Sequence, residues 1–239
     1  NYKGALEEIE RIPQKNHQLL AAYQLITYNR AIELYREQNY EQALGLFDKS
    51  AQYNYDRNTR IKAKYWLAES HYHLKNYTSA AQIFEEIRRL NYSNSFIDKQ
   101  PIAYNLGYTF YQLDNYEKAK TYFNQYIQNA QVKDPRYLDA YLRLADIYFI
   151  SKDFNRAISY YEKAEKISDT YLAYAVYQKA EAYGGNGNLE SKIAVLQSLT
   201  SKRVDYDLSD DAFYELANTH LLLGKDREAI REFQALIIR

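Results

Sequence analysis

Small and large apolar residues recur along this chain at the spacing of one face of an α-helix. The repeated unit is a small residue followed four positions later by an aromatic residue or leucine, one helical turn along the same face. The six copies are Ala43 with Phe47, Ala80 with Phe84, Ala119 with Phe123, Ala157 with Tyr161, Lys192 with Leu196, and Ala229 with Phe233. They are spaced by 37, 39, 38, 35 and 37 residues. The chain is therefore built from an internal repeat, with a lysine in the small position of the fifth copy.

A second small residue precedes each copy by twelve positions. These residues are Ala31, Ala68, Gly107, Ala145, Ala180 and Ala217. Small side chains at both positions let two helices approach closely, while the larger residue fills the adjoining space. Between the two positions lie turn sequences such as Lys75-Asn76 and Gly187-Asn188. We predict an all-α fold in which each repeat is a hairpin of two antiparallel helices.

Three residues before the alanine of three copies stands a tyrosine, Tyr40, Tyr77 or Tyr116. This order of small, tyrosine, alanine and aromatic residues resembles the tetratricopeptide repeat family over essentially the whole chain. The resemblance implies a right-handed superhelical solenoid of antiparallel helix hairpins. The usual period of that family is ~34 residues, and every period here is longer. Because the interval of twelve residues is constant, the additional residues fall between one hairpin and the next.

We expect one solenoid over residues 1–239. It would comprise a half repeat at 1–15 and six repeats at 24–57, 61–98, 100–134, 138–170, 173–205 and 210–239. The half repeat is interpreted as the second helix of a hairpin, since Ala5 lies 38 residues before Ala43. The chain contains no methionine, and terminal repeats normally need a polar outer face. We therefore expect the full-length protein to continue in both directions.

Composition and charge narrow the function classes. The 31 basic and 31 acidic side chains cancel, which argues against a nucleic-acid partner. Without cysteine the chain has no disulfide framework and no thiolate metal site. No apolar run approaches the ~20 residues of a membrane-spanning helix, so we expect no membrane insertion by this fragment.

The usual signatures of catalysis do not occur in the sequence. His71 and His73 are two positions apart and would point to different sides of a helix, so they cannot share a metal ion. The glycine-rich segment 184–188 lacks the Gly-Lys-Ser/Thr that ends a phosphate-binding loop, and is interpreted as a hairpin turn. We therefore expect a non-enzymatic protein with no catalytic residue, no metal and no cofactor.

Nine of the 28 tyrosines fall in columns on the first helices of the hairpins. One column lies three residues before the first small position, and others follow four and seven residues later, on the same face. The resemblance implies that first helices line the concave wall of the superhelix, where tyrosine is a favoured interface residue. The predicted binding residues are Tyr28, Tyr65, Trp66, Tyr72, Tyr104, Tyr108, Tyr111, Tyr177 and Tyr214.

These columns predict a scaffold that binds a peptide or partner protein along a tyrosine-rich concave surface. Tyrosines at these places also pack neighbouring hairpins, so a structural spacer or oligomerisation array is the alternative, and self-association stays open. A third alternative is a regulatory module of a larger protein. The long period, the tyrosines and the lack of cysteine resemble bacterial repeat proteins of the Gram-negative envelope, with a cytoplasmic location also open. In the fifth hairpin, Lys192 and the glycines predict looser packing.

Overall fold

The computed structural model describes residues 2–90, 101–168, 172–201 and 208–238, and these residues form helices joined by turns, with no strand among them. The chain opens with α1 (Tyr2–Glu10). The first helices of the hairpins are α2 (His17–Arg36), α4 (Arg57–His73), α6 (Ile102–Gln112), α8 (Pro135–Ile150), α10 (Ala173–Gly185) and α12 (Ser209–Leu222). The second helices are α3 (Tyr40–Gln52), α5 (Tyr77–Arg89), α7 (Tyr116–Asn129), α9 (Phe154–Ile167), α11 (Leu189–Thr200) and α13 (Asp226–Ile238).

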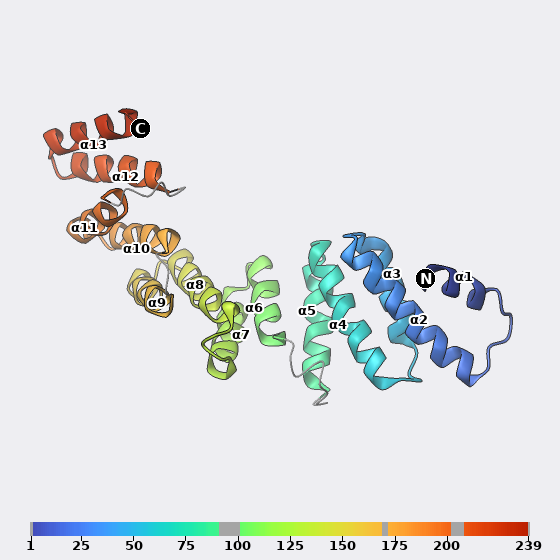
Figure 1. The fold of residues 1–239 in the computed structure, drawn as a ribbon. Helices are drawn as coiled ribbons and strands as arrows, with labels where there is room; N and C mark the ends of the chain where they lie inside the picture. Colours follow the sequence, from blue (N-terminus) through green and yellow to red (C-terminus); the bar gives the residue numbers. More distant parts are fainter. Residues whose placement is uncertain (1, 91–100, 169–171, 202–207, 239) are drawn as a thin grey trace. The chain divides into compact units, whose positions relative to one another are not determined.

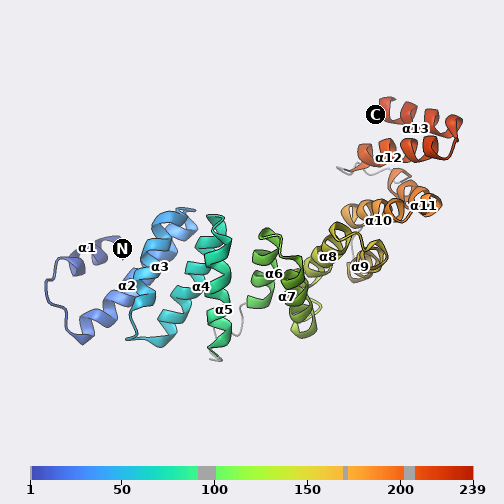
Figure 2. The same cartoon turned by 180° about the vertical axis from the view of Figure 1, so that it is seen from behind.

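The helices pair as hairpins, for example α2 with α3 and α4 with α5 (Figures 1 and 2). This confirms the predicted all-α repeat fold. The chain divides into two compact units, residues 1–122 and 123–239, with the boundary inside α7. One continuous array over both units stays a prediction. The first predicted repeat starts at residue 24, whereas α2 begins at His17, where the Asn16 side chain accepts a hydrogen bond from the Leu19 N–H.

Every hairpin turn has the same backbone geometry. At the end of α2, the N–H of Gln38 donates to the Tyr35 carbonyl and the N–H of Asn39 donates to the Leu34 carbonyl. This pair of bonds, the Schellman motif, recurs in all six turns with lengths of 2.8–3.1 Å. It requires one residue with a left-handed backbone. That residue is Gln38, Lys75, Asp114, Lys152, Gly187 or Gly224, with φ between 54° and 74°.

The residue after the left-handed one donates its N–H to the end of the first helix. In several hairpins its side chain also caps the start of the second helix. The side-chain oxygens of four such residues accept a hydrogen bond from the backbone N–H three positions later, at 3.1–3.4 Å. They are Asn39, Asn115, Asp153 and Asn188. One polar residue therefore ends the first helix with its backbone and starts the second helix with its side chain.

The small positions found in the sequence lie where the helices cross. All ten alanines of the two series have 0% exposure, and Gly107 is also buried. Of the larger residues that follow, Phe47, Phe123, Tyr161 and Leu196 are fully buried and Phe84 is 1% exposed. The predicted packing role of these positions is confirmed.

Lys192 is buried in the fifth hairpin and is stabilised by two carboxylates. Its Nζ lies 2.9 Å from Glu181 and 2.7 Å from Glu215, and the side chain is 10% exposed. A Cβ at Gly184 would lie 2.9 Å from Lys192 Cδ, so the glycine leaves room for the lysine stem. Burial disfavours the charge, but the two carboxylates outweigh it and raise the pKa of Lys192. The fifth hairpin was predicted to pack more loosely partly because a buried lysine charge is costly. Since this charge is paired, that reason does not hold.

Substitutions at two glycines test how backbone conformation affects stability at sites where an added Cβ has room. A Cβ at Gly45, within α3, or at Gly187, in a turn with φ 74°, would meet no atom within 4 Å. We expect Gly45→Ala to stabilise the protein by about 0.5–1 kcal/mol, because alanine favours the helix. Gly187→Ala should destabilise it by about 1 kcal/mol, because the left-handed backbone is strained for alanine. Thermal unfolding followed by circular dichroism measures both, and shifts of the same sign would contradict the turn geometry.

The pairing of Lys192 can be tested by removing its charge. Lys192→Met keeps most of the stem but leaves Glu181 and Glu215 without their cation, so we expect a loss of stability on the order of 2 kcal/mol. Lys166→Met, on the exposed side of α9, should have little effect. Adding Glu181→Gln and Glu215→Gln to Lys192→Met should recover part of the loss in chemical denaturation. A triple variant no more stable than Lys192→Met would contradict the pairing.

Candidate partner-binding site

The predicted binding residues lie on the first helices and differ widely in exposure. Tyr65 is buried at 5% exposure, and Tyr214 is the most exposed of the nine at 52%. The other seven are half-buried. Tyr28, Tyr65, Trp66, Tyr72, Tyr104, Tyr108 and Tyr111 belong to the first unit, and Tyr177 and Tyr214 belong to the second. The structure thus brings seven of these residues into one unit, on α2, α4 and α6.

Part of this set supports the hairpins from within. The Tyr65 ring lies 5.8 Å from Phe84 of α5 and 5.3 Å from Trp66, measured between ring centroids. Trp66 in turn lies 4.9 Å from Tyr35 of α2, and Tyr28 lies 6.1 Å from Phe47 of α3. Tyr28 and Trp66 also pack against the core of the first two hairpins. These rings therefore pack between neighbouring helices of the first two hairpins.

A pocket of about 300 Å³ lies between α4 and α6. Two predicted tyrosines of α6, Tyr104 and Tyr108, stand side by side in it with ring centroids 5.0 Å apart. Tyr72 of α4 forms another part of the wall and contacts Tyr77, with ring centroids 5.3 Å apart. The lining is completed by Glu69, His73, Phe84 and Asn105. We call this the Glu69 pocket.

Among the described residues that line this pocket, Glu69 is the one acidic residue. Asn105 of α6 donates one hydrogen bond to Glu69 Oε1 and another, of 3.1 Å, to the Tyr65 hydroxyl. Burial raises the pKa of the Glu69 carboxyl to about 7, and a hydrogen bond with Tyr65 opposes the shift only in part. Within the described residues, no lysine or arginine accounts for any part of this shift. Glu69 is thus held by neutral groups.

Two other acids occupy the same repeat position in the second unit, and both have a cation nearby. Asp146 accepts hydrogen bonds from Tyr161 and Tyr174, at 2.7 and 2.9 Å, and pairs with Arg143 at 2.7 Å. Glu181 pairs with Lys192, as described above. The same repeat position therefore holds an acid paired with a cation in two hairpins, and in the second hairpin an acid with no cation beside it among the described residues.

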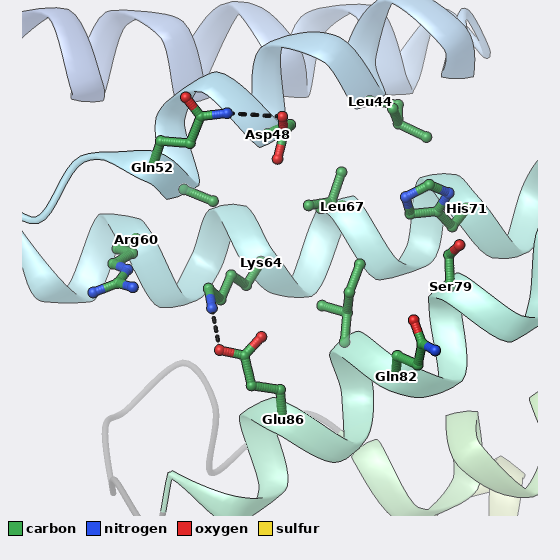
Figure 3. A pocket seen from close by; sticks show the side chains of 12 residues that line it. Leu44, Asp48, Gln52, Arg60, Lys64, Leu67, His71, Ser79, Gln82 and Glu86 are labelled. Atoms are coloured by element: carbon green, nitrogen blue, oxygen red, sulfur yellow. Dashed lines mark hydrogen bonds and ion pairs between the residues drawn. The ribbon is translucent and has the colours of Figure 1, made fainter.

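A second hollow lies on the other side of the first hairpins, among α3, α4 and α5, and has a volume of about 640 Å³. Figure 3 shows Lys64 pointing toward Glu86 across it, and these two side chains form an ion pair. Gln52 donates a 2.9 Å hydrogen bond to Asp48 in the same groove. Two buried nitrogens of residues that line this groove, Arg60 Nε and His71 Nδ1, have no hydrogen-bond partner among the described residues.

The described segments contain no group of three His, Asp or Glu side chains placed to hold a metal ion. None of their helices is long and apolar enough to span a membrane.

Glu69 and Asn105 were not among the predicted binding residues. Only their positions in the repeat could have pointed to them. Glu69 lies four residues after Tyr65, in the column of Tyr108, and Asn105 directly follows Tyr104. The sequence alone gave no indication that the two side chains meet, because they come from different hairpins, 36 residues apart.

Comparisons with known proteins agree with the fold. Family models of the tetratricopeptide repeat match residues 28–94 and 100–170. No curated protein sequence matches the chain. Among solved structures, the C-terminal part of a repeat-containing protein from Cytophaga hutchinsonii has a TM-score of 0.71 at 18% identity. The match covers 88% of this chain and 78% of that one.

Two further structures are similar over most of the chain. YrrB, described as a tetratricopeptide repeat protein with an unusual peptide-binding site, has a TM-score of 0.63 at 19% identity, covering 88% of this chain and 96% of that one. A tetratricopeptide repeat protein from Parabacteroides merdae has a TM-score of 0.59 at 14% identity, covering 98% and 82%. At these identities the likeness concerns the fold alone.

The raised pKa of Glu69 predicts a pH-dependent cost to stability. The folded protein holds the proton of Glu69 up to about pH 7, whereas an ordinary glutamate loses it near 4.5. Ionised Glu69 therefore destabilises the fold, with a cost that is absent below pH 4.5, grows between pH 4.5 and 7, and is complete above pH 7. We expect Glu69→Gln to stabilise the protein at pH 8 by up to about 3 kcal/mol and to have little effect at pH 4.

Glu181→Gln is the matched control, because Glu181 occupies the same repeat position but pairs with Lys192. It should lower the unfolding midpoint at pH 8, since Lys192 then keeps only one carboxylate partner. Thermal unfolding of the two variants and the parent across pH 4 to 8 measures both effects. A destabilising Glu69→Gln at pH 8 would show that the Glu69 charge is compensated in the fold.

Proposed function

The chain belongs to the tetratricopeptide repeat family, and we propose that it is a non-enzymatic scaffold that binds a peptide or a peptide-like segment of a partner protein. Proteins of this kind stack helix hairpins into extended surfaces that bind other proteins. The proposed surface is the face of the first helices in the first unit, where the Glu69 pocket lies.

The observation that carries the proposal is the aromatic lining of this pocket. Three half-buried tyrosines, Tyr72, Tyr104 and Tyr108, surround about 300 Å³ of open volume. Half-buried tyrosines offer a rigid apolar ring and a hydroxyl at small entropic cost, which suits peptide recognition. The similar fold of YrrB, described as having a peptide-binding site, is consistent with this use of the architecture.

Three of the predicted rings have a supporting part in the proposed mechanism. Tyr28, Tyr65 and Trp66 make ring contacts that link α2, α3, α4 and α5. A bound segment would contact the pocket rings of α4 and α6, with Tyr111 further along α6. Tyr177 and Tyr214 would serve the corresponding face of the second unit, where Tyr214 is the more exposed of the two.

Selection from a random peptide library displayed on phage tests this function without a known partner. Peptides enriched on the immobilised protein would be synthesised, and their affinity measured by fluorescence anisotropy. We expect the double variant Tyr104→Ala with Tyr108→Ala to weaken binding at least about tenfold, equivalent to about 1.4 kcal/mol. The single variant Tyr108→Ala should give part of that loss if the double variant is poorly folded by circular dichroism.

Tyr55→Ala is the matched control, because Tyr55 is an exposed tyrosine of the first unit outside the pocket. Its affinity for the selected peptides should equal that of the parent. Peptides that bind the folded double variant as well as the parent would place recognition elsewhere. Failure to enrich any peptide would favour the alternative in which the array spaces or multimerises other domains.

A further inference from the structure

Glu69 differs from the other acids at its repeat position in the charge of the groups around it. It lies in a partly buried pocket, accepts a hydrogen bond from Asn105, and has no cationic side chain facing it in the described part of the chain. An ionised carboxylate removed from water is costly unless a positive charge is supplied. At the same repeat position, Asp146 and Glu181 each receive such a charge from a side chain of the protein itself.

Among the described residues, the groups that face Glu69 come from all the elements packed around it, and none of them is positively charged at neutral pH. Tyrosines with pKa values raised mainly by burial stay neutral, and partial burial lowers the pKa of His73, so that its ring is neutral too. His73 is stacked on Tyr40, with ring centroids 4.4 Å apart and the planes within 3°. The facing residues are Tyr35 of α2, Tyr65, Tyr72 and His73 of α4, Phe84 of α5, and Tyr104, Asn105 and Tyr108 of α6.

The aromatic lining suits the same ligand as the carboxylate. A lysine ammonium or an arginine guanidinium is attracted to the face of a tyrosine ring, and more strongly when water is excluded. The pocket volume of about 300 Å³ is at the lower limit of small-molecule sites, which fits one long side chain better than a whole cofactor. The charge of Glu69, the aromatic lining and the volume of the pocket all fit one lysine or arginine side chain.

We propose that the Glu69 pocket receives a lysine or arginine side chain of the bound peptide, held by the Glu69 carboxylate and the tyrosine rings. This inference rests on the proposed function and adds the residue type that the site selects. The cation would take the place that Lys192 occupies beside Glu181. An acidic segment would be disfavoured at the same position, because it would meet a second negative charge.

The proposal can be tested without a selected peptide by using small probes. N-acetyl-arginine amide and N-acetyl-lysine amide carry the two candidate side chains. N-acetyl-citrulline amide and N-acetyl-norleucine amide are neutral analogues of similar shape. Titration followed by nuclear magnetic resonance would report on the side-chain amide of Asn105, which donates to Glu69. We expect the charged probes to shift this signal with millimolar affinity, and the neutral probes to bind at least about tenfold more weakly.

Two variants and a pH series test whether the Glu69 carboxylate causes the preference for charged probes. Glu69→Gln should abolish the preference for charged probes. Glu86→Gln should not change it, since Glu86 pairs with Lys64 in the opposite groove. For the parent, affinity for the charged probes should rise up to about tenfold between pH 6 and 8, as the carboxyl of pKa about 7 ionises. Equal binding of arginine and citrulline probes, or an unchanged preference in Glu69→Gln, would overturn the proposal.

Binding of the selected peptides and of the small probes can contradict this inference and the proposed function separately. Peptides that bind through Tyr104 and Tyr108 but tolerate replacement of every lysine and arginine by glutamine would overturn the cation pocket and leave the scaffold function standing. Charged probes that shift Asn105 through Glu69, in a protein that enriches no peptide, would support the pocket and count against the peptide-binding function.

Discussion

The close crossing of two helices at a pair of buried small residues is the constraint on which the rest of this structure depends. Twelve residues separate the two positions, and between them lies a turn whose backbone geometry is the same in all six hairpins. The turn fixes where the second helix starts, and the alanines let it lie against the first. Since side chains on helices repeat with a fixed angular period, the turn and the crossing together decide which residues of each first helix face outward.

Lys192 shows how far this constraint can be modified. The fifth hairpin replaces the second small residue by a lysine, yet it keeps the turn hydrogen bonds seen in the others. Room for the stem comes from Gly184, and the charge is balanced by Glu181 and Glu215. A substitution that would be destabilising alone is therefore stabilised by three neighbouring positions. The glycines near this turn have a packing role there, besides the left-handed backbone at Gly187.

The sequence predicted the fold well because its signals are local and repeated. The interval from Ala68 to Ala80, the turn at Lys75-Asn76 and the ring at Phe84 are all found within one hairpin. The candidate site was predicted less completely, because it forms between hairpins. Tyr65 was correctly assigned to a first helix, but its burial against Phe84 and Trp66 depends on neighbouring layers. The contact of Asn105 with Glu69 likewise depends on the packing of α6 beside α4 and α5, whose register is not set by any short sequence pattern.

The acids at one repeat position connect stability with recognition. Asp146 and Glu181 each have a cationic partner inside the protein, although burial still raises the pKa of Asp146. Glu69 has no such partner among the described residues: burial makes its ionised form costly, and that cost falls when a positive group enters the pocket. A binding site gains selectivity in this way, because the free energy lost by desolvating the carboxylate is recovered only with a cation. Neutral side chains of the same size fill the volume but leave the charge uncompensated.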